Sequence, residues 1–330
     1  MGVWTLAWPS IITNLFYATS SIVAIKVVGN LGPDAIAAAV TGQRVTFILQ
    51  AVLTGVLAGS TALIAANRSP EVDKSQIDAL CRSLGGLKCK RFVLISSIAV
   101  LDRFDGQDVE GAETFQFEVA YGRNRRALEE FCENTFERSL ILRLPALFGQ
   151  GLKKNFLFDL LNPVPTMLNA EKITLASDMA KGMYADVISQ IYELDASIGL
   201  YKLDRNALNS NDAKSEIEDA LAHSDLTAVQ FTNPNTQFQY YGLDRLWSDI
   251  EAAFDNDLSV LHLATEPVLA SRIHQLVKAE PMPHTSARLH LEDMHSRHAT
   301  LWGAAGPYLE NADRILERVS AFMAAQRASK

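Results

Sequence analysis

Charged residues are almost absent from the first 66 positions of this 330-residue chain, and this limits how the segment can fold. Only Lys26, Asp34 and Arg44 carry charge there, while the whole chain has a formal net charge of -8. Residues 3–28 and residues 45–66 form two apolar runs, and the second contains no charged residue. A membrane-spanning helix needs roughly 20 apolar residues, so both runs are long enough to span a bilayer.

The two runs predict a hairpin of transmembrane helices. Residues 29–34 form a tight turn between them, and Gly55 and Gly59 would let two helices pack closely. Lysine and arginine follow the second run, which predicts a membrane-associated protein with a cytoplasmic C-terminal domain. The lipid bilayer would then be a partner through residues 3–66. The alternative for these residues is a buried helical hairpin of a soluble protein.

Residues 67–330 mix polar and apolar residues in the usual way and carry a net charge of -9, which predicts a globular acidic domain. Nucleic-acid binding needs clustered lysine and arginine, so we expect no nucleic-acid partner. Three cysteines lack metal-binding spacing, and His284, His290, His295 and His298 lack a further fixed ligand. The sequence therefore predicts no metal site.

The most informative stretch of this domain runs from residue 91 to residue 149. A short apolar run at residues 92–95 predicts a buried strand that ends at Ser96 and Ser97. A helix is predicted over residues 126–136, and residues 140–142 predict a second strand. Strand, helix and strand in this order predict an α/β fold with a parallel sheet, in which ligands bind at the carboxyl ends of the strands.

This stretch resembles the extended short-chain dehydrogenase/reductases, the NAD(P)-dependent epimerase/dehydratase family. Residues 95–100 resemble the strand that ends in the family's catalytic serine. Tyr121 and Arg125 resemble its Tyr-x-x-x-Lys pair, with arginine in place of lysine, and residues 143–149 resemble the turn after its next strand. The resemblance implies an oxidoreductase with NAD or NADP as cofactor and a small-molecule substrate, which in this family is most commonly a nucleotide sugar.

The same resemblance assigns roles to individual residues. A cation one helical turn from a tyrosine stabilises the phenolate form, which lets the tyrosine act as acid or base toward a substrate hydroxyl. Arginine keeps this charge but is permanently protonated and is a poor proton relay. The implied catalytic residues are Ser97, Tyr121 and Arg125, and the implied cofactor-binding residues are Ser96, Pro145, Ala146, Leu147 and Phe148.

The sequence lacks the Gly-x-x-Gly-x-x-Gly turn with which the family's dinucleotide-binding fold starts. We therefore expect an incomplete Rossmann-like parallel sheet flanked by helices, with a small substrate domain in residues 151–258. The transmembrane hairpin would precede it, so that the domains are residues 1–66 and a truncated domain at residues 67–330. We expect its binding of NAD or NADP to be weak or absent.

Residues 6–9, 28–33 and 42–44 resemble the first two helices of multidrug and toxic-compound extrusion (MATE) transporters. Two helices cannot form the central site of such a transporter, which lies between two larger halves. The simplest interpretation is a chimeric reading frame joined near residue 66. Two functions stay open: an impaired epimerase/dehydratase-like oxidoreductase, and a non-catalytic membrane fragment of a MATE-type antiporter.

Periodicity predicts further elements outside these motifs. Apolar residues at helical spacing predict helices over residues 73–84, 178–191 and 243–254. Alternation predicts a strand over residues 237–241, and a short apolar run predicts another over residues 260–263.

Overall fold

The computed structural model describes residues 70–328, apart from residues 104, 105, 107, 152, 153, 180–184, 197 and 223–225. The chain divides into two compact units, Met1–Arg82 and Ser83–Lys330. The predicted hairpin at residues 3–66 lies outside the described residues. Helix α3, Pro70–Gly85, begins in the first unit and confirms the helix predicted over residues 73–84.

The predicted membrane localisation is wrong. Among the helices that the structure describes, none is long and apolar enough to cross a membrane. A spanning helix needs roughly 20 predominantly apolar residues. Helix α12, Ala312–Ala328, has 17 residues and carries four charged side chains in its first two turns, among them Arg314, Glu317 and Arg318.

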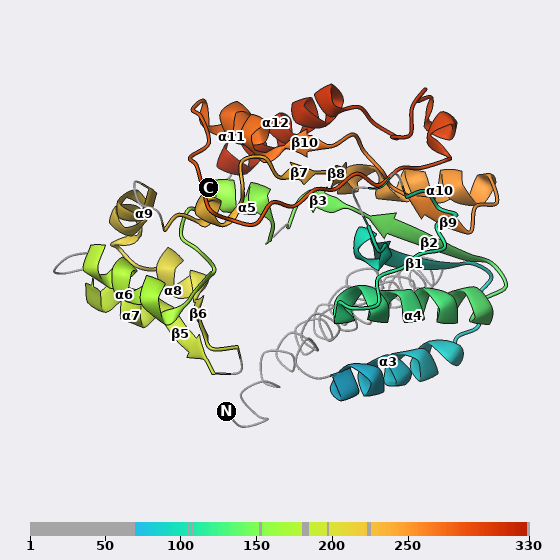
Figure 1. The fold of residues 1–330 in the computed structure, drawn as a ribbon, viewed down its shortest axis with the longest axis horizontal. Helices are drawn as coiled ribbons and strands as arrows, with labels where there is room; N and C mark the ends of the chain where they lie inside the picture. Colours follow the sequence, from blue (N-terminus) through green and yellow to red (C-terminus); the bar gives the residue numbers. More distant parts are fainter. Residues whose placement is uncertain are drawn as a thin grey trace, which may run out of the picture. The chain divides into compact units, whose positions relative to one another are not determined.

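A three-stranded parallel sheet forms the centre of the second unit (Figure 1). Its strands are β1 (Phe92–Ser97), β2 (Ser139–Leu144) and β9 (Val260–His262), in the order β1-β2-β9. Ser96 is aligned with Arg143 and Arg143 with His262, so one row of side chains crosses all three strands. The parallel α/β arrangement predicted from the apolar runs is confirmed.

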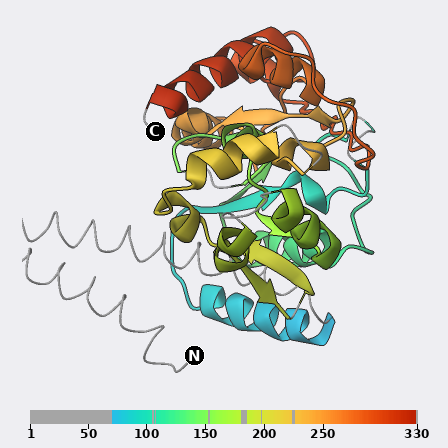
Figure 2. The same cartoon turned by 90° about the vertical axis from the view of Figure 1, so that its left-hand side faces the viewer.

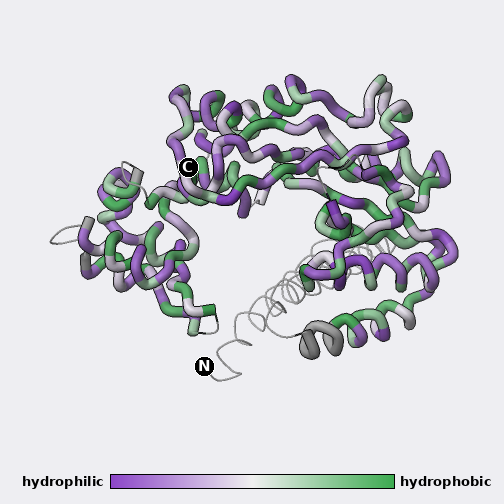
Figure 3. Tube along the Cα trace, in the orientation of Figure 1, coloured by the Kyte–Doolittle hydropathy of each residue, from purple (hydrophilic) through white to green (hydrophobic). Residues whose placement is uncertain are grey.

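Both faces of β2 are buried, because successive side chains of a strand point to opposite faces. Leu140 and Leu142 belong to a core cluster that includes Phe254 of helix α10 (Leu246–Asp255). Arg143 points the other way and contacts helix α4 (Ala120–Thr135). Burying one leucine side chain contributes roughly 1.5–3 kcal/mol, which explains why the apolar run forms a central strand. Figure 3 shows α4 as mostly hydrophilic with hydrophobic residues interspersed, as expected for a helix with one buried side.

A second core cluster surrounds two short pairs of strands. β3 (Ala146–Phe148) pairs in parallel with β8 (Tyr240–Gly242), and β7 (Gln237–Phe238) pairs antiparallel with β10 (Val268–Leu269). These strands pack with α12 and with two further helices, α5 (Phe156–Leu161) and α11 (Ala270–Lys278).

The strand predicted over residues 237–241 is divided at Gln239, between β7 and β8. The side-chain nitrogen of Gln239 donates to the backbone carbonyls of Thr265 and Met294. The backbone nitrogen of Met294 donates to the side-chain oxygen of Gln239 at 2.7 Å. The helix predicted over residues 243–254 begins with the 3-10 turn η5, Leu243–Arg245, and continues as α10.

A third core cluster holds a small antiparallel sheet and its helices (Figures 1 and 2). The strands β4 (Met167–Leu168), β6 (Leu200–Leu203) and β5 (Tyr192–Asp195) lie in the order β4-β6-β5. The helices are α6 (Ala170–Met179), α7 (Ala185–Ile191), α8 (Arg205–Asn209) and α9 (Lys214–Ala222). These elements fall within residues 151–258, and their role as a substrate domain stays a prediction.

A single helix is predicted from the sequence over residues 178–191, and part of this range, residues 180–184, lies outside the described residues. Helix α6 ends at Met179 and helix α7 begins at Ala185.

Candidate active site at the carboxyl ends of the parallel strands

Strand β1 delivers Ser97 to the edge of the sheet. Ser97 is the last residue of the strand and caps the 3-10 helix η2 (Ile98–Val100), because its Oγ accepts a hydrogen bond from the Ala99 nitrogen at 3.2 Å. A hydroxyl has one donor hydrogen and two acceptor positions. The capping bond uses one acceptor position, so the hydroxyl hydrogen can still donate to a ligand.

Gly122 sets how closely the first turn of α4 approaches η2. A Cβ atom at this position would collide with the Ala99 carbonyl oxygen and would lie 2.7 Å from Cγ of Gln116. Only glycine lets the helix backbone pass the end of β1 at this distance. The close passage sets Tyr121, the preceding residue, beside η2 in the first turn of the helix.

Arg125 lies one turn further along α4 and faces both the strand and the tyrosine. Its Nη1 donates to the Ile95 carbonyl at 3.2 Å, and its guanidinium carbon is 5.6 Å from the centre of the Tyr121 ring. The side chain is buried, and within the described part of the chain its Nε has no hydrogen-bond partner. The structure thus brings Tyr121 and Arg125 together at the end of β1, where Ser97 also lies.

The residues that the resemblance assigned to cofactor binding lie in different surroundings. Ser96 is buried, and its hydroxyl donates to a carboxylate oxygen of Glu129 at 2.5 Å. Ala146, Leu147 and Phe148 form β3, which follows Pro145 directly. Phe148 is buried in the second core cluster and lines a groove of about 580 Å³ with Gly149, Asp244 and Phe322.

The sequence did not lead us to a buried ion pair that contacts Ser96. Glu129 of α4 is fully buried and receives two hydrogen bonds from Arg143, from Nε at 3.1 Å and from Nη2 at 2.7 Å. The remaining nitrogen of Arg143, Nη1, lies 3.1 Å from Nε2 of His262. Ser96, Arg143 and His262 occupy the one row that crosses the three strands, and Glu129 covers this row from the helix.

His262 completes the row as a neutral imidazole. Its Nδ1 lies 2.9 Å from the His295 carbonyl, so we assign the ring proton to Nδ1 and the acceptor role toward Arg143 to Nε2. Burial lowers the pKa of His262 from 6.5 to about 4; the carboxylate of Glu110 opposes this and the charge of Arg143 adds to it. The His262 backbone nitrogen also donates to Glu110, which ties the row to a neighbouring loop.

Two signals in the sequence could have revealed this row. Glu129 follows Tyr121 by two helical turns and stands next to the buried Leu128, where a carboxylate needs a partner. Arg143 interrupts an otherwise apolar strand. A buried charge of each sign in consecutive elements predicts an ion pair between them.

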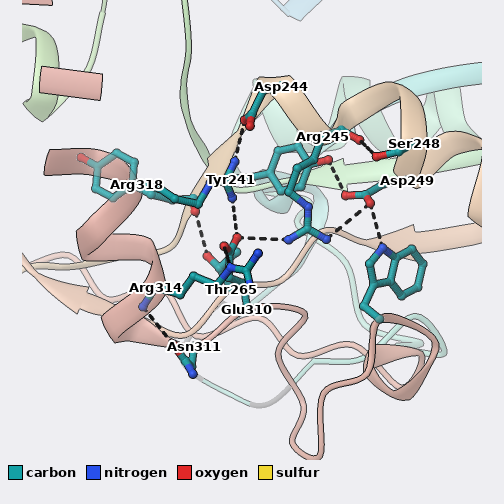
Figure 4. A network of polar contacts seen from close by, with 12 residues as sticks. Tyr241, Asp244, Arg245, Ser248, Asp249, Thr265, Glu310, Asn311, Arg314 and Arg318 are labelled. Atoms are coloured by element: carbon teal, nitrogen blue, oxygen red, sulfur yellow. Dashed lines mark hydrogen bonds and ion pairs between the residues drawn. The ribbon is translucent and has the colours of Figure 1, made fainter. Parts of the chain in front are cut away.

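A second group of charged residues surrounds Glu310, which is far from Glu129 in the sequence (Figure 4). Three guanidinium groups approach its buried carboxylate: Arg245 at 3.1 Å, Arg314 at 3.1 Å and Arg318 at 2.6 Å. Arg318 also contacts Asp244, and a Cβ atom at Gly242 would collide with its guanidinium group.

Beside this group lies a cavity of about 590 Å³, lined among others by Glu266, Trp302 and Tyr308. The charges around Glu310 are balanced by Asp244 and by Asp249, which contacts Arg245 at 3.4 Å. We therefore assign this group to the packing of α12 against η5 and α10.

No group of three or more metal-ligating side chains that could hold an ion occurs in the part of the chain that the structure describes. His295, one of the histidines noted in the sequence, lies 3.2 Å from Asp293 and 3.1 Å from the Tyr308 hydroxyl. His290 lies 3.0 Å from Glu292. These two histidines therefore have protein partners.

In the comparisons, the start of the chain matches a different group of known proteins from the rest of it. The family described as MatE matches residues 9–68, all of which lie outside the described residues. No curated protein matches the chain.

Among solved structures, a UDP-galactose 4-epimerase is 12% identical, with 78% of this chain and 72% of that chain covered and a TM-score of 0.46. A UDP-N-acetylglucosamine 4-epimerase from Methanobrevibacter ruminantium M1 is 10% identical, with 82% and 74% covered and a TM-score of 0.47. Other similar structures were solved with NAD or NADPH. With TM-scores below 0.5, no residue role or substrate passes from these proteins to this chain. The MatE match falls on the segment that resembles MATE transporters, and the structural matches cover most of the chain.

Proposed function

We propose that the described part of this chain is a nicotinamide-dependent oxidoreductase of the epimerase/dehydratase type, with Tyr121 as the acid/base. The observation that carries the proposal is the placement of Arg125. Its guanidinium group is fixed by the Ile95 carbonyl and faces the Tyr121 ring, at the carboxyl end of a parallel strand. This edge of an α/β sheet is where ligands bind.

Each of the three residues would have one task during oxidation of a substrate alcohol. The phenolate oxygen of Tyr121 takes the proton of the substrate hydroxyl, and Arg125 stabilises the phenolate before that transfer. Ser97 donates its hydroxyl hydrogen to the same substrate oxygen and orients it. A nicotinamide cofactor, when bound, would supply the acceptor for the hydride that leaves the substrate carbon.

The residues present fit one end of such a cofactor. The buried Nε of Arg125 lacks a partner among the described residues and could donate to a ribose hydroxyl near the nicotinamide. The sequence contains no Gly-rich turn between strand and helix to hold the pyrophosphate. We therefore propose that NAD or NADP binds with a dissociation constant near or above the millimolar range, which corresponds to about 4 kcal/mol.

A small molecule with a secondary hydroxyl is the substrate class that this chemistry requires, and a nucleotide sugar is our first choice. The alternative, a non-catalytic fragment of a MATE-type transporter, depends on residues that the structure does not describe. Among the described residues of the second unit, no contact favours it over the oxidoreductase.

The test compares the full chain with Tyr121→Phe at millimolar NAD and UDP-glucose, followed by NADH absorbance and by separation of epimers. Loss of a positioned acid/base lowers the rate by about 10²–10⁴, and the affinity for NADH, measured by fluorescence titration, should not change. Tyr308→Phe, outside residues 151–258, is the matched control: it removes a hydroxyl that donates to Asp293 and should keep full activity. Equal turnover of Tyr121→Phe, or no turnover of the full chain with any nucleotide sugar, would reject the proposal.

A further inference from the structure

The carboxylate of Glu129 accepts hydrogen bonds from other residues besides Arg143. Glu129 also accepts hydrogen bonds from the Ser96 hydroxyl and from Nη1 of Arg126 at 3.0 Å. One carboxylate thus joins α4 to β1 through Ser96 and to β2 through Arg143. The paired contacts of Arg143 fix the guanidinium plane as well as its distance.

Stability alone does not explain such a pair. Taking two charges out of water costs several kcal/mol per ion, and a buried ion pair is often no better for stability than apolar residues of similar volume. The pair does fix the position of the helix. Its two parallel hydrogen bonds define both the rotation and the axial position of the helix that carries the carboxylate.

The helix positions that this geometry controls are those of the proposed site. Tyr121, Arg125 and Glu129 follow one another at intervals of four residues and therefore share one face of α4. Gly122 allows the first turn to approach η2, but a glycine contributes no contact that fixes the rotation of the helix. Glu129 is the residue on this face that is tied to both neighbouring strands.

We propose that Glu129 and Arg143 are positioning residues for the tyrosine helix. Their pair, supported by Ser96 and His262 in the same row, sets the register of α4 against β1 and β2. It thereby holds Arg125 on the Ile95 carbonyl and Tyr121 at the sheet edge. The inference rests on the proposed function for what Tyr121 does there, but the register itself is a property of the fold and can be measured separately.

The experiment separates register from stability with Glu129→Gln, Arg143→Gln and the double variant in the full chain. Glu129→Gln leaves the buried Arg143 without its carboxylate partner and should lower the urea midpoint strongly. Arg143→Gln leaves Glu129 with Arg126 as its remaining ion-pair partner and should lower the midpoint less. The double variant leaves no buried unpaired charge in the pair and should recover most of the midpoint. Glu130→Gln is the matched control, because Glu130 lies on the same helix but is exposed and forms its ion pair with Arg126.

Hydrogen exchange of the backbone amides of residues 123–126 reports the register of the first turn, and the amides of β2 report the sheet. In the double variant we expect β2 amides to regain protection, while amides 123–126 exchange about tenfold faster than in the unchanged chain. With NAD and UDP-glucose as probes, kcat should stay at least about tenfold low and KM should change little. Glu130→Gln should match the unchanged chain in all three readouts.

In the double variant, the exchange rates at residues 123–126 could return to those of the unchanged chain together with the urea midpoint. That result would show that the pair has only a structural role, and it would overturn the inference. If instead Tyr121→Phe keeps full turnover, or the full chain has none, the proposed function fails while the exchange data still decide the register.

Discussion

His262 should make the stability of this protein depend on pH in a window set by a single buried imidazole. The ring is fully buried, accepts from Arg143 at Nε2 and faces the carboxylates of Glu110 and Glu129. Its replacement by glutamine, His262→Gln, keeps one donor and one acceptor but cannot take up a proton in this range.

The size of the effect follows from the two protonation equilibria. The pKa of His262 is lowered from 6.5 to about 4 in the folded chain, chiefly by burial. The unfolded chain therefore binds a proton below about pH 6.5 that the folded chain refuses until about pH 4, so the free energy of unfolding falls as the pH falls through this window. A difference of about 2.5 pKa units at about 1.4 kcal/mol each gives a loss of about 3.5 kcal/mol.

Urea unfolding of the full chain and of His262→Gln at pH 7, 5.5 and 4.5 measures this loss. Most other titrating groups are common to both proteins, so the difference between the two pH profiles isolates the imidazole. The titration of Glu110, which accepts a hydrogen bond from the His262 backbone, can also change with the substitution. Parallel profiles for the two proteins would show that His262 takes up its proton in the folded state and would refute the neutral assignment.

Two further substitutions test the packing and the electrostatics around the strands. Gly122→Ala should destabilise the chain by about 1–3 kcal/mol in urea, because the collision of the new methyl group with the Ala99 carbonyl outweighs the roughly 1 kcal/mol helix preference for alanine. Asp159→Asn should stabilise the chain at pH 8 by about 2 kcal/mol and change it little near pH 4. Burial raises the pKa of Asp159 to about 7 against the opposing charge of Arg205, so the folded state loses stability as the pH rises from about 4 to about 7. A variant no more stable than the unchanged chain at pH 8 would contradict that reasoning.

The sequence predicted the elements whose signals are local. The apolar runs that became β1 and β2 have no competing interpretation, and their order with α4 required a parallel pair. The start of α4 was misplaced, at residue 126 instead of Ala120, for a physical reason. Val119 makes no side-chain cap, and Gly122 in the first turn is typical of a loop until its contact with Ala99 is known.

The candidate site likewise has one part that local spacing predicts and one part that it does not. The pairing of Tyr121 with Arg125 depends on helix geometry over four residues, and spacing alone could predict it. The row of Ser96, Arg143 and His262 depends on the register of three strands that are far apart in the chain. The division of the 237–241 strand likewise depends on Gln239 reaching Met294, 55 residues away.

Gly242 and Arg318 occupy the same small volume, since a side chain at one position would displace the guanidinium group at the other. A larger residue at 242 requires a shorter residue at 318, and it also requires Asp244 and Phe148 to move, since their atoms lie 2.6 and 2.9 Å from the added Cβ. Shortening residue 318 releases Glu310 and Asp244 from one of their partners. Related sequences should show the two positions changing together, and the order of the changes is constrained as well. Shortening residue 318 first loses two ion pairs, whereas enlarging residue 242 first forces a collision, so the route through a shortened residue 318 is the more accessible one.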